Sequence, residues 1–158
     1  MADYRSLVNQ GTEILSEVLH ALYETMLLIR RFEEKIIDIY PEQDMKSPVH
    51  LCIGEEAIAA GVCANLNKED YISSTHRSHG HCLAKGADPK YLYAEFYGRV
   101  TGCCKGKGGS MHPAFPEIGI LGTSAIVGGG IPLAVGMALA SKLRSDGRIS
   151  VTFFGDDA

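Results

Sequence analysis

The second half of the chain alternates between helices, glycine-rich loops and short apolar strands, and this alternation constrains the fold more than any other feature. Residues 132–144 (PLAVGMALASKLR) predict a helix, and the turn SDG leads from it into an apolar strand at residues 149–154. An earlier strand is predicted at residues 71–75, YISST. Strands that alternate with helices favour an α/β fold with a mostly parallel sheet. The sequence stops where the crossover to a further parallel strand would start, so we expect the sheet to be incomplete at this end.

Three further helices are predicted from local patterns. Residues 13–40 repeat apolar side chains every three or four positions, which indicates a long amphipathic helix that ends before Pro41. Residues 54–66 predict a shorter, alanine-rich helix. Asp88 and Pro89 suit the N-cap and the first position of the helix that follows them. Residues 42–50 are loop-like, and no regular element is assigned to the polar stretch HRSHGH.

Length and charge exclude several classes of protein. The 158 residues are enough for one domain with a sizeable core, and leave little room for two. A net charge of −4 and scattered basic residues argue against nucleic-acid binding. The five cysteines form no CxxC pair and no secretion signal precedes them, so we expect reduced thiols in a cytosolic protein.

One uncharged stretch, residues 118–141, is long enough to cross a membrane. Six glycines and Pro132 interrupt it, and strongly polar residues flank it. We therefore interpret it as a buried loop that leads into a core helix, and expect no membrane insertion.

A glycine and two aspartates follow the last predicted strand. Ligands of open α/β sheets bind beyond the carboxyl ends of the strands, which is where Asp156 and Asp157 are expected to lie. Carboxylates repel a phosphate, but they bind Mg²⁺, which in turn holds phosphate oxygens. The alternative is that Asp156 caps a following helix, and the local sequence does not decide between the two.

Two glycine-rich segments are candidates for anion binding. The loop CKGKGGSMH, residues 104–112, combines glycines with Lys105 and Lys107, although it matches neither the Walker nor the dinucleotide spacing. A flexible surface loop is the alternative. The triple glycine at residues 128–130 opens a helix, whose N-terminus could attract an anion or could simply pack closely on the sheet.

A group of histidines surrounds one arginine in the segment THRSHGHC. His76, His79, His81 and Cys82 are possible zinc ligands, but their spacing suits none of the common zinc patterns. Some of them are more plausibly structural, while others line a pocket. Arg77 is the natural phosphate partner among them.

Five segments together resemble one known family: HLCIGEEA, THRSHGHCLAKG, TGCCKGKGGSMH, IVGGGIPLAVG and FFGDDA. They occur in the order seen in the α subunit of thiamine diphosphate-dependent 2-oxoacid dehydrogenase E1 components. The resemblance covers about residues 20–158 and is strongest to the acetoin dehydrogenase branch, with THRSHGHC as the distinguishing segment. It implies a thiamine diphosphate-binding fold. It also implies residues 1–45 as an N-terminal helical segment, and residues 46–158 as the first part of the cofactor-binding domain.

The resemblance also implies cofactors and partners. Thiamine diphosphate and Mg²⁺ lie between an α and a β subunit of an α2β2 heterotetramer, and the acyl product passes to a lipoyl-bearing E2 component. The carboxylate that activates the aminopyrimidine comes from the β chain, so Glu55 and Glu56 are expected to be acids at a helix N-terminus.

The resemblance implies site residues position by position. Asp156 matches the Mg²⁺ ligand, and Asp157 and Ala158 continue that motif along the cofactor. By the same resemblance, His76 and Arg77 match positions that contact the diphosphate, Ala125 and Val127 match positions beside the cofactor's ring system, and His50 matches a histidine that lines the active-site channel.

The sequence departs from the family pattern at three places. Asp157 stands where the metal motif normally has glycine, and Ala125 replaces a usual glycine in GTSA. The asparagine that completes the metal site lies beyond Ala158. The missing asparagine and Asp157 leave open that the chain is a non-catalytic fragment that acts only in subunit assembly. The His/Cys cluster leaves a zinc module as a further alternative.

Overall fold

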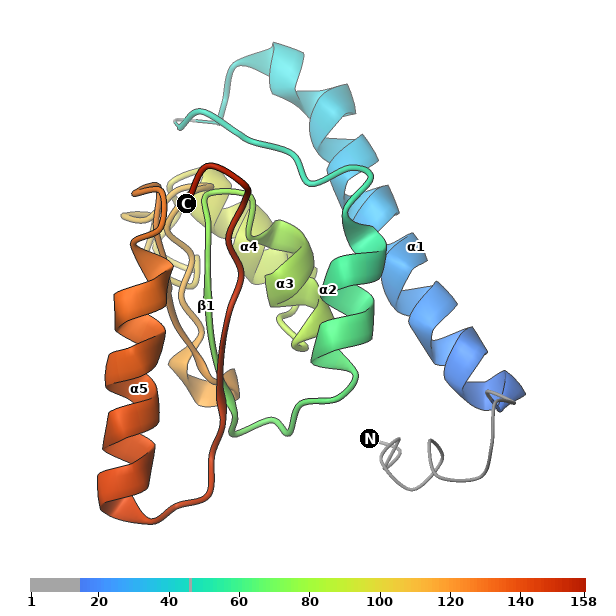
Figure 1. The fold of residues 1–158 in the computed structure, drawn as a ribbon. Coiled ribbons are helices and arrows are strands. Elements are labelled where there is room, and N and C mark those ends of the chain that lie inside the picture. Colours follow the sequence, from blue (N-terminus) through green and yellow to red (C-terminus); the bar gives the residue numbers. More distant parts are fainter. Residues whose placement is uncertain (1–14, 46) are drawn as a thin grey trace.

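The computed structural model describes residues 15–45 and 47–158, and these residues form a three-layered α/β arrangement. Helix α5 (Gly130–Arg144) covers one face of a small sheet, and helices α2 (Glu56–Cys63) and α3 (His79–Ala84) cover the other. The long helix α1 (Ser16–Ile39) packs outside α2 and α3 (Figure 1). The predicted start of this helix, at residues 13 and 14, lies outside the described residues.

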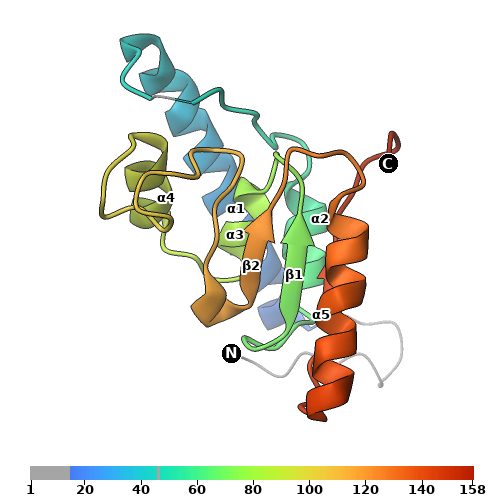
Figure 2. The same ribbon diagram turned by 90° about the vertical axis from the view of Figure 1, so that its left-hand side faces the viewer.

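The sheet has three parallel strands in the order β2-β1-β3. Strand β1 (Tyr71–Ser74) is central, and it pairs with β2 (Ile120–Thr123) and β3 (Ser150–Thr152). All four residues of β1 are buried, as expected of the middle strand of a sheet that is covered on both faces. The predicted α/β class and parallel sheet are confirmed. Figure 2 shows that β1 and β2 end at the same edge, which is also where the chain reaches its last residues.

The uncharged stretch at residues 118–141 contains a strand that the sequence analysis did not predict. It begins at the last residue of the 3₁₀ helix Pro116–Ile118, its first part forms strand β2, and only the second part forms α5. Among the described residues, no helix is both long and apolar enough to cross a membrane.

Helix α5 meets the sheet through small side chains. A Cβ atom at Gly130 would lie 2.8 Å from Ser73 Oγ and 2.9 Å from Thr152 Oγ1, so close packing requires a glycine here. Of the whole helix only Gly130, Ala134 and Ser141 are buried. The prediction of a core helix was therefore wrong for its outer face, where large apolar side chains are exposed: Leu133, Val135, Leu139 and Leu143.

The opposite layer contains the main hydrophobic core. Helix α1 contributes Ile29, Phe32 and Ile36, whereas Leu15 and Leu19 of the same predicted stripe are exposed. Helix α3 was not predicted, because its first three residues, HGH, carry no apolar periodicity. It is nevertheless almost fully buried, and its two histidines have hydrogen-bond partners inside the protein.

The glycine-rich loop is folded around a buried carboxylate from helix α4 (Pro89–Phe96). Both oxygens of Glu95 accept backbone N–H groups of the loop, from Cys104 at 2.7 Å, Gly106 at 2.9 Å, Gly108 at 2.7 Å and Gly109 at 3.2 Å. These donors are therefore committed to an internal anion, and the loop is neither a phosphate cradle nor a loose surface segment. The predicted cap of α4 is confirmed, since Asp88 Oδ1 accepts the N–H of Lys90 at 3.0 Å.

Candidate functional site at the carboxyl ends of the strands

A cavity of about 480 Å³ lies where the three parallel strands end. The segments that follow β1, β2 and β3 each contribute to its wall, and the start of α2 and one residue of α3 close it. This is the position at which open α/β sheets bind ligands. The lining residues are Glu55, Ile58, Thr75, His76, Arg77, His81, Ser124, Ile126, Val127, Gly128 and Phe153 to Asp157.

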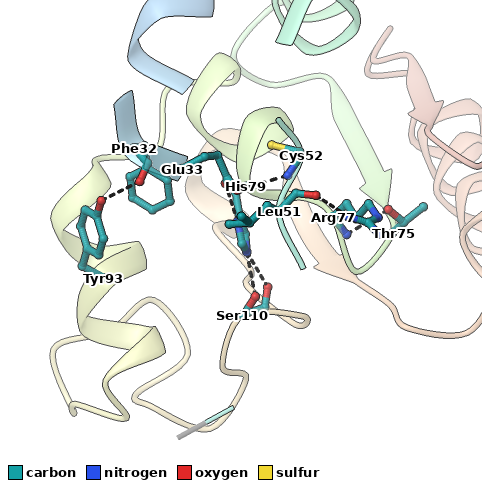
Figure 3. Close-up of polar contacts among 9 residues, drawn as sticks. All are labelled: Phe32, Glu33, Leu51, Cys52, Thr75, Arg77, His79, Tyr93 and Ser110. Atoms are coloured by element: carbon teal, nitrogen blue, oxygen red, sulfur yellow. Dashed lines mark hydrogen bonds and ion pairs between the residues drawn. The ribbon is translucent and has the colours of Figure 1, made fainter. Parts of the chain in front are cut away.

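Arg77 is the positively charged residue of the cavity wall. Its backbone N–H donates to Thr75 Oγ1 at 3.1 Å, and its guanidinium donates to the backbone carbonyl of Leu51 (Figure 3). The side chain is exposed, so its other N–H groups are available to a ligand. A guanidinium that is fixed at one end in this way suits a phosphate oxygen.

His76 lies beside Arg77 and is half-buried. Burial, with smaller contributions from His50 and Arg77, lowers the pKa of His76 below its usual value. The ring of His50 meets that of His76 edge-on, with 4.9 Å between the ring centroids. The lowered pKa favours the neutral imidazole of His76, which donates or accepts single hydrogen bonds without adding charge.

Three carboxylates oppose the single guanidinium. Asp156 and Asp157 follow β3, and Glu55 stands at the N-cap position of α2 without a side-chain cap bond. All three are exposed toward solvent. Since the acids outnumber the arginine, this wall favours a cation, and it accepts an anion best when a divalent cation accompanies it.

Glu56 has a structural role instead. It pairs with Arg30 at 2.6 Å and accepts the N–H of Gly54, and the hydrogen bond from Arg30 lowers the pKa of Glu56 to about 2. This agrees with the expectation of an acid at a helix N-terminus.

His81 is a wall residue that the sequence analysis did not assign to the site. Its Nδ1 lies 2.7 Å from Ser74 Oγ, and its ring stacks on Phe153 with 3.7 Å between the ring centroids. Burial lowers the pKa of His81 to about 4, so the ring is neutral at physiological pH. Its place in an unpredicted helix explains why the sequence did not point to it.

The structure gathers most of the predicted site residues, but not all of them. His76, Arg77, Val127, Asp156 and Asp157 line the cavity. Three others stand outside its wall: His50 is in contact with His76, Ala125 is exposed on the loop after β2, and Ala158 lies near Gly128.

The possible zinc ligands do not converge. His79 uses both ring nitrogens on Glu33 and Ser110, and His81 turns toward Ser74. In the described part of the chain, the only group of three potential ligand atoms that lie close together is Glu95, Cys103 and Cys104, outside the histidine segment. The segment THRSHGHC therefore does not form a zinc site.

The cavity and fold agree with a family comparison. A family model described as "dehydrogenase E1 component" matches residues 24–158, which is most of the chain. The chain belongs to the dehydrogenase E1 component family. The predicted thiamine diphosphate-binding fold is that of this family, and the small parallel sheet with flanking helices is the part of it that is present.

Curated members of the E1 family resemble the chain over nearly its full length. It is 49% identical to the α subunit of acetoin:2,6-dichlorophenolindophenol oxidoreductase from Bacillus subtilis. The 152 matched residues cover 96% of this chain and 46% of that protein. The corresponding Cupriavidus necator subunit is 47% identical over 90% of this chain and 43% of its own length. The pyruvate dehydrogenase E1 component subunit alpha of Zymomonas mobilis is 45% identical, over 89% of this chain and 40% of its own length. The chain thus spans less than half the length of these relatives.

Proposed function

We propose that the chain is the N-terminal part of the α subunit of a thiamine diphosphate-dependent E1 component. The complete enzyme cleaves acetoin or oxidatively decarboxylates pyruvate, and passes the acyl group to a lipoyl-bearing E2 component. The observation that carries the proposal is the meeting of Arg77, His76 and Asp156 at the carboxyl ends of parallel strands. The family membership and the acetoin- and pyruvate-type relatives support it.

The donor set of the cavity fits the diphosphate end of this cofactor when Mg²⁺ accompanies it. Arg77 binds a phosphate oxygen through its free N–H groups, and neutral His76 adds a hydrogen bond. Asp156 is the carboxylate ligand of the metal, which the acid-rich wall attracts. When bound, thiamine diphosphate supplies a carbanion that attacks the substrate carbonyl.

The remaining assigned residues serve the other end of the cofactor. Val127 presents an exposed apolar side chain at the cavity, and Ala125 precedes it on the same loop, so both suit the flat face of a ring. His50 contacts His76 edge-on, and we assign it to the lining of the active-site channel, as the family resemblance implies. Asp157 and Ala158 follow the metal ligand along the diphosphate.

A β subunit completes the site in an α2β2 heterotetramer, and the enzyme works in the cytoplasm. The apolar outer face of α5 favours a partner surface there, and all five cysteines are free thiols, as a reducing compartment requires. The same face also supports a second candidate function, in which the chain acts only in assembly with a β-type subunit. The division into a helical segment, residues 1–45, and a cofactor domain, residues 46–158, remains part of this proposal.

Calorimetric titration of thiamine diphosphate into the complex of the full-length α chain and its β partner, with Mg²⁺ present, tests the catalytic proposal. Arg77→Gln removes a charged hydrogen bond and is expected to weaken binding about 10-fold to 100-fold. Asp156→Asn is expected to abolish the dependence of binding on Mg²⁺. Asp38→Asn, an exposed acid of α1, is the matched control and is expected to bind like the wild type.

The two candidate functions give different results. A wild-type complex that forms but takes up no cofactor would leave only the assembly role. Failure of the chain to associate with any β-type subunit in a pull-down would remove the assembly role as well. Asp157→Gly restores the glycine of the family motif, and tighter cofactor binding by this variant would show that Asp157 opposes the diphosphate.

A further inference from the structure

A buried acid–histidine pair links helix α1 to helix α3 behind the cavity. Both Glu33 and His79 are fully buried, and Glu33 Oε1 lies 2.6 Å from His79 Nδ1 (Figure 3). Burying a carboxylate costs free energy unless it is paired and hydrogen-bonded. Two apolar side chains of similar volume would therefore stabilise this part of the core at least as well. The pair is none of the residues that the family resemblance assigned to the site.

The second oxygen of the carboxylate is directed to the segment that carries His50. Glu33 Oε2 accepts the backbone N–H of Cys52 at 3.2 Å. The preceding residue, Leu51, uses its carbonyl to accept the guanidinium of Arg77. Glu33, the backbone of residues 51 and 52, and Arg77 therefore form one continuous series of contacts from the core to the cavity wall, as Figure 3 shows.

His79 fixes the orientation of this carboxylate. Nδ1 lies 2.6 Å from Glu33 Oε1, and Nε2 lies against Ser110, 2.8 Å from its Oγ and 3.2 Å from its backbone carbonyl oxygen. Ser110 belongs to the glycine-rich loop, residues 104–112, and its own N–H donates to Ser47 Oγ at 3.0 Å. The imidazole is thus held from both sides, and the carboxylate cannot rotate away from Cys52 without breaking a buried hydrogen bond.

We propose that Glu33 and His79 form a positioning pair that holds residues 50–52, and through them Arg77 and His50, in place for the cofactor. The inference rests on the proposed function, because it assigns Arg77 to the diphosphate. Neither residue of the pair touches the cavity. Its effect on cofactor binding passes through the Cys52 N–H and the Leu51 carbonyl.

Two substitutions at one position separate this role from a merely structural one. In His79→Asn, the side-chain amide nitrogen occupies the place of Nδ1 and still donates to Glu33, while the Ser110 contact is lost. In His79→Gln, the amide reaches the place of Nε2 and keeps Ser110, but Glu33 loses its donor. Each variant leaves one of the two buried ring-nitrogen positions without a replacement, Nε2 beside Ser110 in the first and Nδ1 beside Glu33 in the second, so a structural role predicts a loss of stability in both.

The measurement is the Kd for thiamine diphosphate of the assembled complex with Mg²⁺, together with kcat at saturating cofactor and the melting temperature. Positioning partners outside a binding site typically contribute about 10-fold to 100-fold to its affinity or activity. We expect His79→Gln to weaken cofactor binding by at least about 10-fold. His79→Asn is expected to stay close to the wild type in Kd, although its melting temperature also falls.

Tyr93→Phe is the matched control in the same core. It removes the hydrogen bond from Tyr93 Oη to the carbonyl of Phe32, at 2.9 Å, next to Glu33 but outside the series of contacts that reaches Arg77. This variant is expected to lower the melting temperature and to leave Kd unchanged. If His79→Gln yields no complex, Glu33→Gln replaces it, because the amide keeps the shape of the side chain while the charge is lost.

The outcomes distinguish the two proposals. Equal Kd values for the wild type, His79→Asn and His79→Gln would overturn the positioning role alone, and so would equal weakening by both substitutions. If the wild-type complex binds no thiamine diphosphate, the proposed function fails, and the positioning role fails with it.

Discussion

Acidification from pH 7 to pH 5 is expected to destabilise the fold through His81. This ring is 7% exposed, its Nδ1 is hydrogen-bonded to Ser74, and one of its faces stacks on Phe153. Burial, with a smaller contribution from His79, lowers the pKa of His81 from 6.5 to about 4. A proton on the folded ring would be desolvated, so the folded state binds it more weakly than the unfolded chain does.

The sign and size follow from proton linkage. Between the two pKa values the unfolded chain carries the proton and the folded chain does not, so acid favours unfolding. The contribution of His81 is fully present above the unfolded value of 6.5 and is lost progressively as the pH falls toward the folded value of about 4. Between pH 7 and pH 5 the expected loss of unfolding free energy is about 2 kcal/mol.

Urea unfolding at the two pH values, for the wild type and for His81→Phe, isolates this contribution. Phenylalanine keeps a ring for Phe153 to stack on. It leaves the Ser74 hydroxyl without a partner, which costs about 1–3 kcal/mol at either pH. The wild type is expected to lose about 2 kcal/mol more than the variant on acidification. Equal losses in both proteins, or an NMR titration that places the pKa of His81 near 6.5, would refute the reasoning.

Three further predictions concern packing and local hydrogen bonds. Gly130→Ala is expected to destabilise the fold by about 1–3 kcal/mol, because its Cβ meets two hydroxyl groups of the sheet. Gly136→Ala, with nothing within 4 Å of the added Cβ, is expected to stabilise α5 by about 0.5–1 kcal/mol. The urea midpoint should therefore fall in Gly130→Ala and rise in Gly136→Ala, and midpoints that both fall or both rise would contradict this reasoning. Glu95→Gln removes the charge that four backbone donors share, so we expect at least about 3 kcal/mol of destabilisation and faster hydrogen exchange in the glycine loop. Unchanged exchange would argue against that role. Asp88→Ala is expected to cost about 1 kcal/mol in thermal unfolding, and no change would show that the N-cap bond contributes little.

The parts of the fold that the sequence predicted are those with local signals. Asp88 and Pro89 start a helix by their own geometry, and the period of α1 identifies its buried stripe from Ile29 to Ile36. The alternation of strands and helices was enough to predict parallel pairing, because parallel neighbours need a crossover between them. None of these inferences required knowledge of a distant residue.

The parts that were missed depend on distant partners. The sequence of helix α3 is typical of a polar segment, because the partners that allow His79 to be buried are distant in the chain. Glu33 lies 46 residues earlier and Ser110 lies 31 residues later. The glycine loop resembled an anion-binding loop, and it does bind an anion, but the anion is the carboxylate of Glu95 in the same protein. Periodicity contains no information on such pairings, which exist only once the chain has folded.

The charge of the cavity wall implies an order among its ligands. Arg77 shares the cavity wall with three acids, Glu55, Asp156 and Asp157. In the absence of a metal cation, the repulsion between these carboxylates and a diphosphate exceeds the attraction by the one guanidinium at long range. In the proposed function a divalent cation bound by Asp156 would reverse that balance, and we then expect the metal and the diphosphate each to increase the affinity of the cavity for the other by the same factor. Asp157 strengthens this dependence, because it adds a carboxylate where the family motif has glycine. Under the proposed function we expect such a site to keep the diphosphate only while the metal is present, and the proposed positioning of Arg77 by the buried pair to determine how well that contact is made.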